Sequence, residues 1–415
     1  MISNYHPFVH VGADILVVAL CAKALIENYL YRRKPERLPP FTLLFAFHFF
    51  WVLINIFHPY SLSLFSSVAG AKVYVSMFTL YFFGFYLVKS VKDVHFFIWP
   101  WIGITLVHTF TGVYQGLTGP DSVLALHSRY SVQLSKFADQ AFRPFGLTNL
   151  PGAPAVWIFL VTPLVVYMIF NNRSKLMRVL MILAAPFLGL TLVLCQVRSA
   201  IFKTLFGVSM YYLGNLVRIG RLSWRRAAYN FALTSLLVGS TFYFLPQLTN
   251  YAEDSYAENV RAVKRSLTTF EYDSMSHARR GAWERFTKYL VEVPFGAGLA
   301  RVGAAGGAFE KLRNRDPYFS ADHFFADNFW IASLVELGFP GMLLLTFILF
   351  GILIRGFFSL RDQKDPQKRS LQLAILSALT ASVVGLYGAE GVLYNPESSF
   401  FWFFSGVLMR LSSDD

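Results

Sequence analysis

The sequence predicts an all-α integral membrane protein with about eleven transmembrane helices, and the pattern allows ten to twelve. Of the 415 residues, 55% are hydrophobic, whereas soluble domains are usually about 45–50% apolar. Apolar runs long enough to cross a bilayer as helices recur along the whole chain. The 37 lysines and arginines outnumber the 24 carboxylates. Because this excess lies in short loops between apolar runs, where it sets orientation, we expect membrane lipids as partners and no nucleic acid.

The first five apolar runs are separated by loops that alternate between basic and nearly uncharged. Runs 11–31 and 155–170 and the third run, which reaches Val88, all end in lysines or arginines. Run 40–56 leads to an uncharged loop, and run 96–114 leads to a long polar loop, 115–153. Cytoplasmic loops carry the excess of Lys and Arg, so the N-terminus is expected on the outer face.

The remaining six runs continue this alternation. Runs 180–194 and 201–216 flank a tight turn, and four arginines follow the second of them. Run 229–245 precedes the longest polar segment of the chain. Run 329–354 ends in five cations, and runs 371–387 and 400–411 return the C-terminus to the cytoplasm.

The polar segment between the eighth and ninth runs predicts a folded extramembrane cap. Residues 251–327 contain eleven lysines or arginines and eleven carboxylates, more paired charge than a linker needs. Two stretches, 256–270 and 276–293, place apolar residues at helical spacing. The predicted domains are therefore transmembrane helices 1–8 over 1–246, the cap or catalytic loop over 247–327, and transmembrane helices 9–11 over 328–415.

Glycines mark two places where backbone is expected to approach other groups closely. Pro294 should end the second amphipathic stretch, and the glycines after it, Gly296 and Gly298, suit a chain that folds back toward the membrane near a ligand. Gly338 and Gly341 lie beside an acid within the ninth run, which predicts close helix packing there.

Four arginines on the predicted outer face are candidates for binding phosphate. Arg143 precedes the fifth run, Arg198 lies in the turn between the sixth and seventh, and Arg279 and Arg280 open the second amphipathic stretch. An arginine against hydrocarbon costs roughly 2.5–3.5 kcal/mol on insertion scales, and guanidinium binds phosphate oxygens bidentately. The alternatives are lipid head groups for Arg198, and a solvated face or Glu284 for the other pair.

Three residues just before the ninth run are candidates for proton transfer. Asp322, His323 and Asp327 end the polar segment, where the start of a helix would hold a general base toward an acceptor hydroxyl. The alternative for Asp327 is an N-terminal helix cap. Both cysteines lie in apolar runs, and no Cys or His pair has the spacing of metal ligands, so neither a metal nor another cofactor is expected.

Several of these patches occur in an order that resembles a known family. They are Arg143 to Gly152, Val197-Arg198-Ser199-Ala200, Arg279 or Arg280 with Trp283 and Pro294 to Leu299, and Asp327-Asn328-Phe329-Trp330 followed by Glu336-Leu337-Gly338 and Gly341. In sequence, spacing and topology the chain resembles the bacterial O-antigen polymerase and O-antigen ligase superfamily. The likeness covers roughly residues 140–345, and the first 140 residues contribute only hydropathy.

The resemblance implies a metal-independent glycosyltransferase in the bacterial inner membrane. Its donor would be a glycan on undecaprenyl diphosphate, and its acceptor another glycan or the lipid A core. The arginines would hold the diphosphate, and Asp327, His323 or Asp322 would supply the base. In the ligases the position before the asparagine is typically His, whereas here it is Asp327, with His323 four residues earlier, so we favour polymerase over ligase.

A protein of another class, a non-enzymatic transporter or flippase for lipid-linked glycans, is the remaining alternative. Such a protein would place charged residues deep within several spans, along a path. The apolar runs contain few of them, and Glu336 is the main exception.

Overall fold

A computed structural model describes residues 37–75, 78–126, 142–148, 150–172, 174–218, 283–302, 328–389 and 391–413, together with four isolated positions between 19 and 26. Within these residues every regular element is a helix and no strand occurs, as the sequence predicts. The chain divides into two compact units, and each is described by itself. The first unit comprises residues 1–4, 91–272 and 364–381, and the second comprises 5–90, 273–363 and 382–415.

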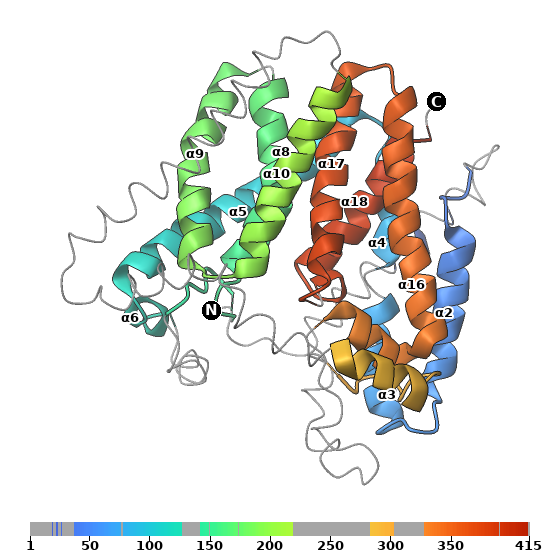
Figure 1. Ribbon diagram of the computed structural model, residues 1–415. Helices are drawn as coiled ribbons and strands as arrows, with labels where there is room; N and C mark the ends of the chain where they lie inside the picture. Colours follow the sequence, from blue (N-terminus) through green and yellow to red (C-terminus); the bar gives the residue numbers. More distant parts are fainter. Residues whose placement is uncertain are drawn as a thin grey trace. The chain divides into compact units, whose positions relative to one another are not determined.

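The first unit is built on four long helices, with most of a fifth beside them (Figure 1). They are α5 (Val91–Thr118), α8 (Pro154–Asn171), α9 (Lys175–Leu194), α10 (Arg198–Arg218) and α17 (Pro366–Gly385), with the short α6 (Asp121–Leu124) after α5. Helix α8 packs against α5, α9 and α10. It begins with proline at its first position, where a missing N–H removes no intrahelical bond.

Polar contacts and a small residue join α8, α10 and α17. The Asn171 side chain donates to the Ser370 hydroxyl at 3.2 Å, and the hydroxyls of Ser370 and Tyr211 lie 2.8 Å apart. A Cβ atom added to Gly214 would lie 2.6 Å from Leu373 Cδ1. Lipid supplies no hydrophobic force between helices, so close backbone approach and hydrogen bonds of this kind hold them together.

The second unit contains α2 (Thr42–Ile56), α3 (Leu64–Val75), α4 (Thr79–Leu87), a helix over 283–292, α16 (Phe329–Asp362), the 3-10 turn η2 (Gly391–Leu393) and α18 (Glu397–Leu411). Helix α2 packs against α3 and α16, and α4 packs along α18. Glycines permit the second contact, because a Cβ on Gly84 would overlap the carbonyl of Phe403 and one on Gly406 would overlap the carbonyl of Tyr81.

Helix α16 begins at the asparagine cap rather than at the preceding acid. Its N-cap is Asn328, whose side-chain oxygen accepts from the Ile331 amide at 2.8 Å, as expected of a capping side chain. The alternative that Asp327 caps this helix is therefore wrong, because the helical residues begin one position later than that alternative requires.

Helix α16 is interrupted at Gly338. The backbone there has φ 69° and ψ −178°, which is not helical, and only glycine adopts this region without strain. The Leu337 carbonyl accepts instead from the Trp51 indole nitrogen of α2 at 2.7 Å. The close packing predicted at Gly341 is present, since an added Cβ would lie 2.9 Å from Trp51 Cδ1. The helix then continues to Asp362, past the predicted end at residue 354.

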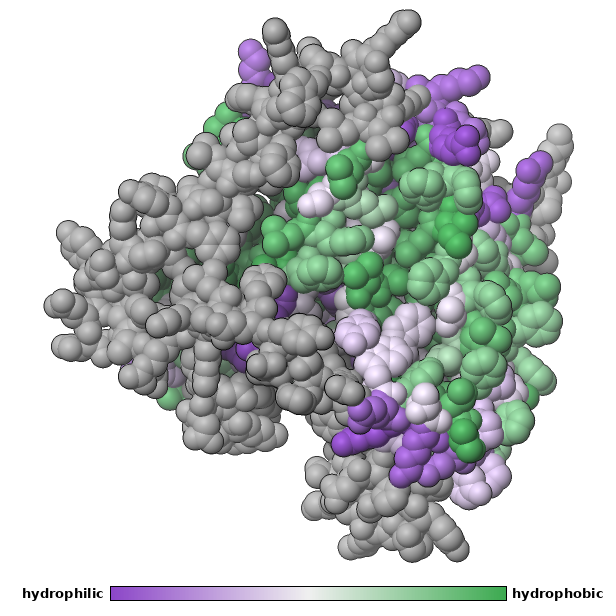
Figure 2. All heavy atoms as spheres, viewed as in Figure 1, coloured by the Kyte–Doolittle hydropathy of each residue, from purple (hydrophilic) through white to green (hydrophobic). Residues whose placement is uncertain are grey.

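Five described segments are long and apolar enough to cross a membrane: Leu64–Leu87, Val91–Thr118, Pro154–Asn171, Lys175–Leu194 and Phe329–Asp362. Helix α2 is a shorter apolar helix. On the face shown in Figure 2, apolar side chains cover much of the described surface, and hydrophilic side chains gather in the upper right and lower parts of the view. The predicted run 229–245 and nearly all of 11–31 lie outside the described residues, so the count of eleven stays a prediction.

Candidate functional site

A buried glutamine of α5 holds the loop that carries Arg143. Gln115 accepts from the amides of Phe145 and Gly146 at 2.9 and 2.8 Å and donates to the Gly146 carbonyl at 2.9 Å. The loop also donates from the Leu147 amide to a ring nitrogen of His108 at 3.3 Å. Three of these hydrogen bonds are made by the Gln115 side chain, which is 2% exposed. They therefore fix the position of the Arg143 loop relative to α5.

The turn that carries Arg198 lies against the same loop. Gln196 has φ 52°, a left-handed conformation that reverses the chain between α9 and α10, and its side chain donates to the Phe142 carbonyl at 3.2 Å. Gly152 lies between the two parts. A Cβ there would lie 2.6 Å from Val197 Cγ2, 3.2 Å from the Cys195 carbonyl oxygen and 3.9 Å from Arg143 Cδ.

These contacts bring Arg143 and Arg198, 55 residues apart in the sequence, into electrostatic reach of each other. The pKa of Arg143 lies below its usual value, because burial disfavours the charged form and because the positive charge of Arg198 is close. The Arg143 Nε atom is buried and has no hydrogen-bond partner among the described residues, whereas Arg198 is exposed. In the described part of the chain, no carboxylate pairs with either arginine.

Two neighbouring guanidinium groups with no carboxylate paired to them among the described residues favour an anion. Each group repels the other, and a ligand that carries two or more negative charges would neutralise both. Guanidinium matches phosphate oxygens bidentately, and the bond is charge-assisted. The Arg143–Arg198 pair is therefore a candidate site for a phosphate or diphosphate group.

In the second unit, a segment of the predicted cap lies in the break of α16. We call residues 294–302 the inserted segment. The Ala297 amide donates to the Val335 carbonyl at 2.6 Å, and the Phe339 amide donates to the Pro294 carbonyl at 2.8 Å. These contacts satisfy backbone groups that the interruption at Gly338 removes from the helix ladder. Where a helix is broken inside a membrane, its freed backbone groups need such partners.

Glycines make this insertion possible. Gly296 and Gly298 have φ values of 93° and 91°, and a Cβ on Gly296 would lie 2.8 Å from the Gly338 amide nitrogen. A Cβ on Gly298 would lie 3.1 Å from the hydroxyl of Ser61 in the α2–α3 loop. The backbone that the sequence predicts to fold back at these glycines thus passes directly against α16 and against that loop.

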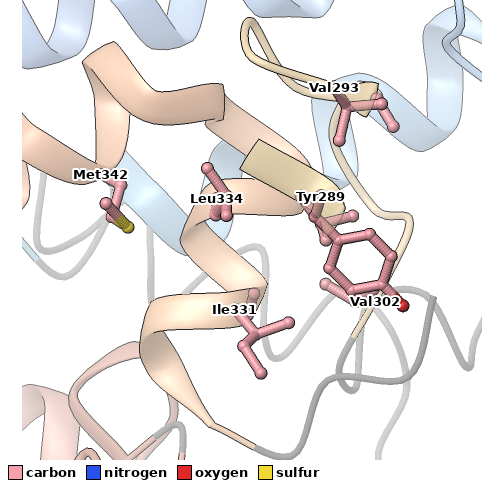
Figure 3. Packing of buried hydrophobic residues seen from close by; sticks show 9 residues of the cluster. Tyr289, Val293, Val302, Ile331, Leu334 and Met342 are labelled. Carbon is pink, nitrogen blue, oxygen red and sulfur yellow. The ribbon is translucent and has the colours of Figure 1, made fainter. Parts of the chain in front are cut away.

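Apolar packing fixes the helix over 283–292 and the inserted segment onto α16, mostly onto its residues before Gly338. Figure 3 shows the buried side chains involved: Tyr289, Val293, Val302, Ile331, Leu334 and Met342. The helix predicted within 276–293 is present over 283–292, and Pro294 follows it in a turn. At its start, the Trp283 ring stacks on Tyr387 with centroids 5.3 Å apart.

The remaining candidate residues are not covered by the structure. Arg279, Arg280, Asp322, His323 and Asp327 all lie outside the described residues. Their convergence with Arg143 and Arg198 on one site stays a prediction.

Sequence reasoning missed the residues that organise these sites. Gln115 and His108 carry the loop of Arg143, and Trp51 completes the break of α16. The available signal was a polar side chain within or at the end of an apolar run, as for Gln115 and His108. Such a residue needs an internal partner once it is buried.

Comparison with known proteins gives one family. The sequence model of a family described as O-antigen ligase matches residues 183–346. The matched range contains Arg198, the cap and the first part of α16, whereas Arg143 lies ahead of it. No curated protein matches the chain.

Proposed function

From the match of residues 183–346 to the O-antigen ligase family model, we propose that this chain joins undecaprenyl-diphosphate-linked glycan units into a polysaccharide. It does so as an integral-membrane glycosyltransferase on the periplasmic face of the bacterial inner membrane, with a periplasmic N-terminus and a cytoplasmic C-terminus. The observation that carries the proposal is the pair of guanidinium groups at Arg143 and Arg198, held by a rigid loop and turn. A lipid-linked glycan presents a doubly anionic group of matching chemistry.

In this proposal the arginine pair acts on the leaving group. The acceptor hydroxyl oxygen attacks the anomeric carbon of the donor sugar, and the bond from that carbon to the diphosphate oxygen breaks. Negative charge then accumulates on the departing undecaprenyl diphosphate. Positioned cations stabilise such developing charge more than they stabilise the ground state, so Arg143 and Arg198 favour departure without a metal ion. Arg279 or Arg280 would add a third positive charge from the cap.

The proton of the acceptor hydroxyl goes to a base that precedes α16. Asp327 is the first candidate, His323 the second and Asp322 the third. Asn328 caps the helix, so the carboxylate of Asp327 is not required for that task. A positioned general base contributes roughly 10²–10⁴-fold to rate.

The second candidate function is transfer of a finished glycan to the lipid A core. The description of the matching family, O-antigen ligase, favours it, whereas aspartate at position 327 favours the polymerase. The two differ only in acceptor, because donor, leaving group and base are shared. The product separates them: longer lipid-linked chains mean a polymerase, and glycan on lipid A means a ligase.

The test uses the full-length chain in cells that lack their own copy. We expect Arg198→Ala to lower the yield of product roughly 10–100-fold, which corresponds to a charged hydrogen bond of about 1.5–3 kcal/mol. Asp327→Ala should lose more, whereas Arg198→Lys should keep part of the activity. Lys288→Ala is the control, because that exposed cation pairs with Glu292 at 3.6 Å and surface pairs contribute little. Glycan chains of wild-type length with both Arg198→Ala and Asp327→Ala would refute the proposal.

A further inference from the structure

A buried carboxylate lies where the inserted segment meets α16. Glu336 is 4% exposed, and its Oε1 accepts from the Val302 amide at 3.0 Å. The Arg301 amide and the Tyr74 hydroxyl of α3 donate to the same carboxylate. Glu336 lies two residues before the break at Gly338. One side chain therefore joins α16, α3 and the end of the inserted segment.

We propose that Glu336 is a positioning residue for the transfer reaction, which locks the inserted segment into the break of α16. This inference rests on the proposed function. It names a residue that touches neither donor nor acceptor and acts through the parts of the chain that it holds in place.

The chemistry of the contact favours a carboxyl group over an amide. The Val302 and Arg301 amides can only donate, the Tyr74 hydroxyl donates as well, and a carboxyl group offers two accepting oxygens to them. A glutamine offers one accepting oxygen and an amide group that would face N–H or O–H donors. In a buried place such polar bonds are stronger than in water, and an unpaired donor there is correspondingly unfavourable. Glutamine is therefore a poor replacement, although it fills the same volume.

The inserted segment is also bound to the α2–α3 loop. The Arg301 side chain, 1% exposed, donates from Nε to the Ala297 carbonyl at 3.1 Å and from a terminal nitrogen to the Tyr60 carbonyl. A Cβ on Gly70 of α3 would lie 2.6 Å from the Ala300 amide nitrogen. With backbone this close on both sides, the segment has no room to shift while Glu336 holds its end.

The positioning role follows from the places that Glu336 connects. Glu336 binds Val302, the last residue of the inserted segment. Glu336 itself belongs to the part of α16 that precedes the break at Gly338, and Asn328 caps the start of that part. The candidate base Asp327 directly precedes Asn328 in the sequence. A loose inserted segment would free the first part of α16 to shift, and a displacement of about 1 Å at a reacting group lowers rate about 100-fold.

The experiment compares Glu336→Ala, Glu336→Gln and the control Ser333→Ala in the full-length purified chain. Ser333 is buried in the same part of α16, and its hydroxyl has no hydrogen-bond partner among the described residues, so its removal should change neither readout. The first readout is amide hydrogen exchange over 294–302. The second is kcat and KM for transfer, with lipid-linked glycan extracted from cells that lack this chain.

We expect faster exchange over 294–302 in both Glu336 variants, with kcat lower by about 100-fold in Glu336→Ala and KM for the donor nearly unchanged. Wild-type exchange in Glu336→Ala would overturn the lock, and faster exchange with wild-type kcat would overturn the positioning role. If the wild-type chain itself transfers no glycan, the proposed function and the positioning role both fail. Hydrogen exchange would still decide separately whether Glu336 holds the segment.

Discussion

Replacing Gln115 by leucine should detach the Arg143 loop from α5. The glutamine makes three hydrogen bonds to backbone groups of Phe145 and Gly146, and leucine has a similar size but no polar atoms. The substitution therefore removes every one of these bonds while it leaves the packing volume of the site nearly unchanged.

The magnitude follows from the groups left behind. Two amides and one carbonyl lose their partner inside a contact where the glutamine is 2% exposed. Each unsatisfied buried group costs about 1–3 kcal/mol, so three cost roughly 3 kcal/mol even at the low end of that range. Gln115→Glu should cost less, because it still accepts from both amides, but its carboxylate faces the Gly146 carbonyl oxygen.

The assay is the thermal midpoint of the purified chain together with its affinity for undecaprenyl diphosphate. We expect Gln115→Leu to lower the thermal midpoint and the affinity for undecaprenyl diphosphate, and Gln115→Glu to lower the thermal midpoint by a smaller amount. Thr118→Ala is the control, because the Thr118 hydroxyl is exposed and, among the described residues, donates to the Tyr114 carbonyl of its own helix alone. An unchanged affinity in a destabilised Gln115→Leu chain would refute the link between this loop and the candidate anion site.

Three further predictions test the same contacts. Gly338→Ala forces a side chain into a backbone region that is essentially restricted to glycine, at about 1–3 kcal/mol, and into overlap with the inserted segment, so the thermal midpoint should fall sharply. Gly103→Ala, with open space around Gly103, should leave the thermal midpoint unchanged or slightly raised. In Arg143→Lys, diphosphate binding should weaken as pH rises toward 10. Burial and the neighbouring positive charge depress the pKa of a cation at this position, and only the protonated lysine amine binds the diphosphate. Diphosphate affinity that does not change with pH would contradict this prediction. Trp51→Phe leaves the Leu337 carbonyl without its donor and should destabilise the chain by about 1–3 kcal/mol, as a lower thermal midpoint would reveal.

Local features of the chain were readable from the sequence. Apolar runs predicted most of the described helices, because a lipid-facing helix must be apolar over its whole length. Pro294 predicted the end of the cap helix, since proline cannot continue the ladder. The order of the arginine, glycine and Asp-Asn patches predicted the family that the comparison supports.

Contacts between distant parts of the chain could not be predicted from the sequence. The interruption of α16 is invisible in hydropathy, because residues on both sides of Gly338 are apolar. The alternative that Asp327 caps α16 is wrong, and residue type could not have excluded it, because aspartate and asparagine cap about equally well. Only the backbone assigns that task to Asn328.

By itself, the sequence determined the membrane class, the helical content and which residues carry charge near the predicted outer face. The tertiary structure decided which of these charges meet and which backbone groups they depend on. Gln115 binds a residue 31 positions away, and Trp51 binds one 286 positions away. Periodicity and propensity act over a few turns of chain, whereas such contacts arise only when packing brings separate helices together. For that reason the candidate anion site and the break in α16 belong to the fold rather than to any one stretch of sequence.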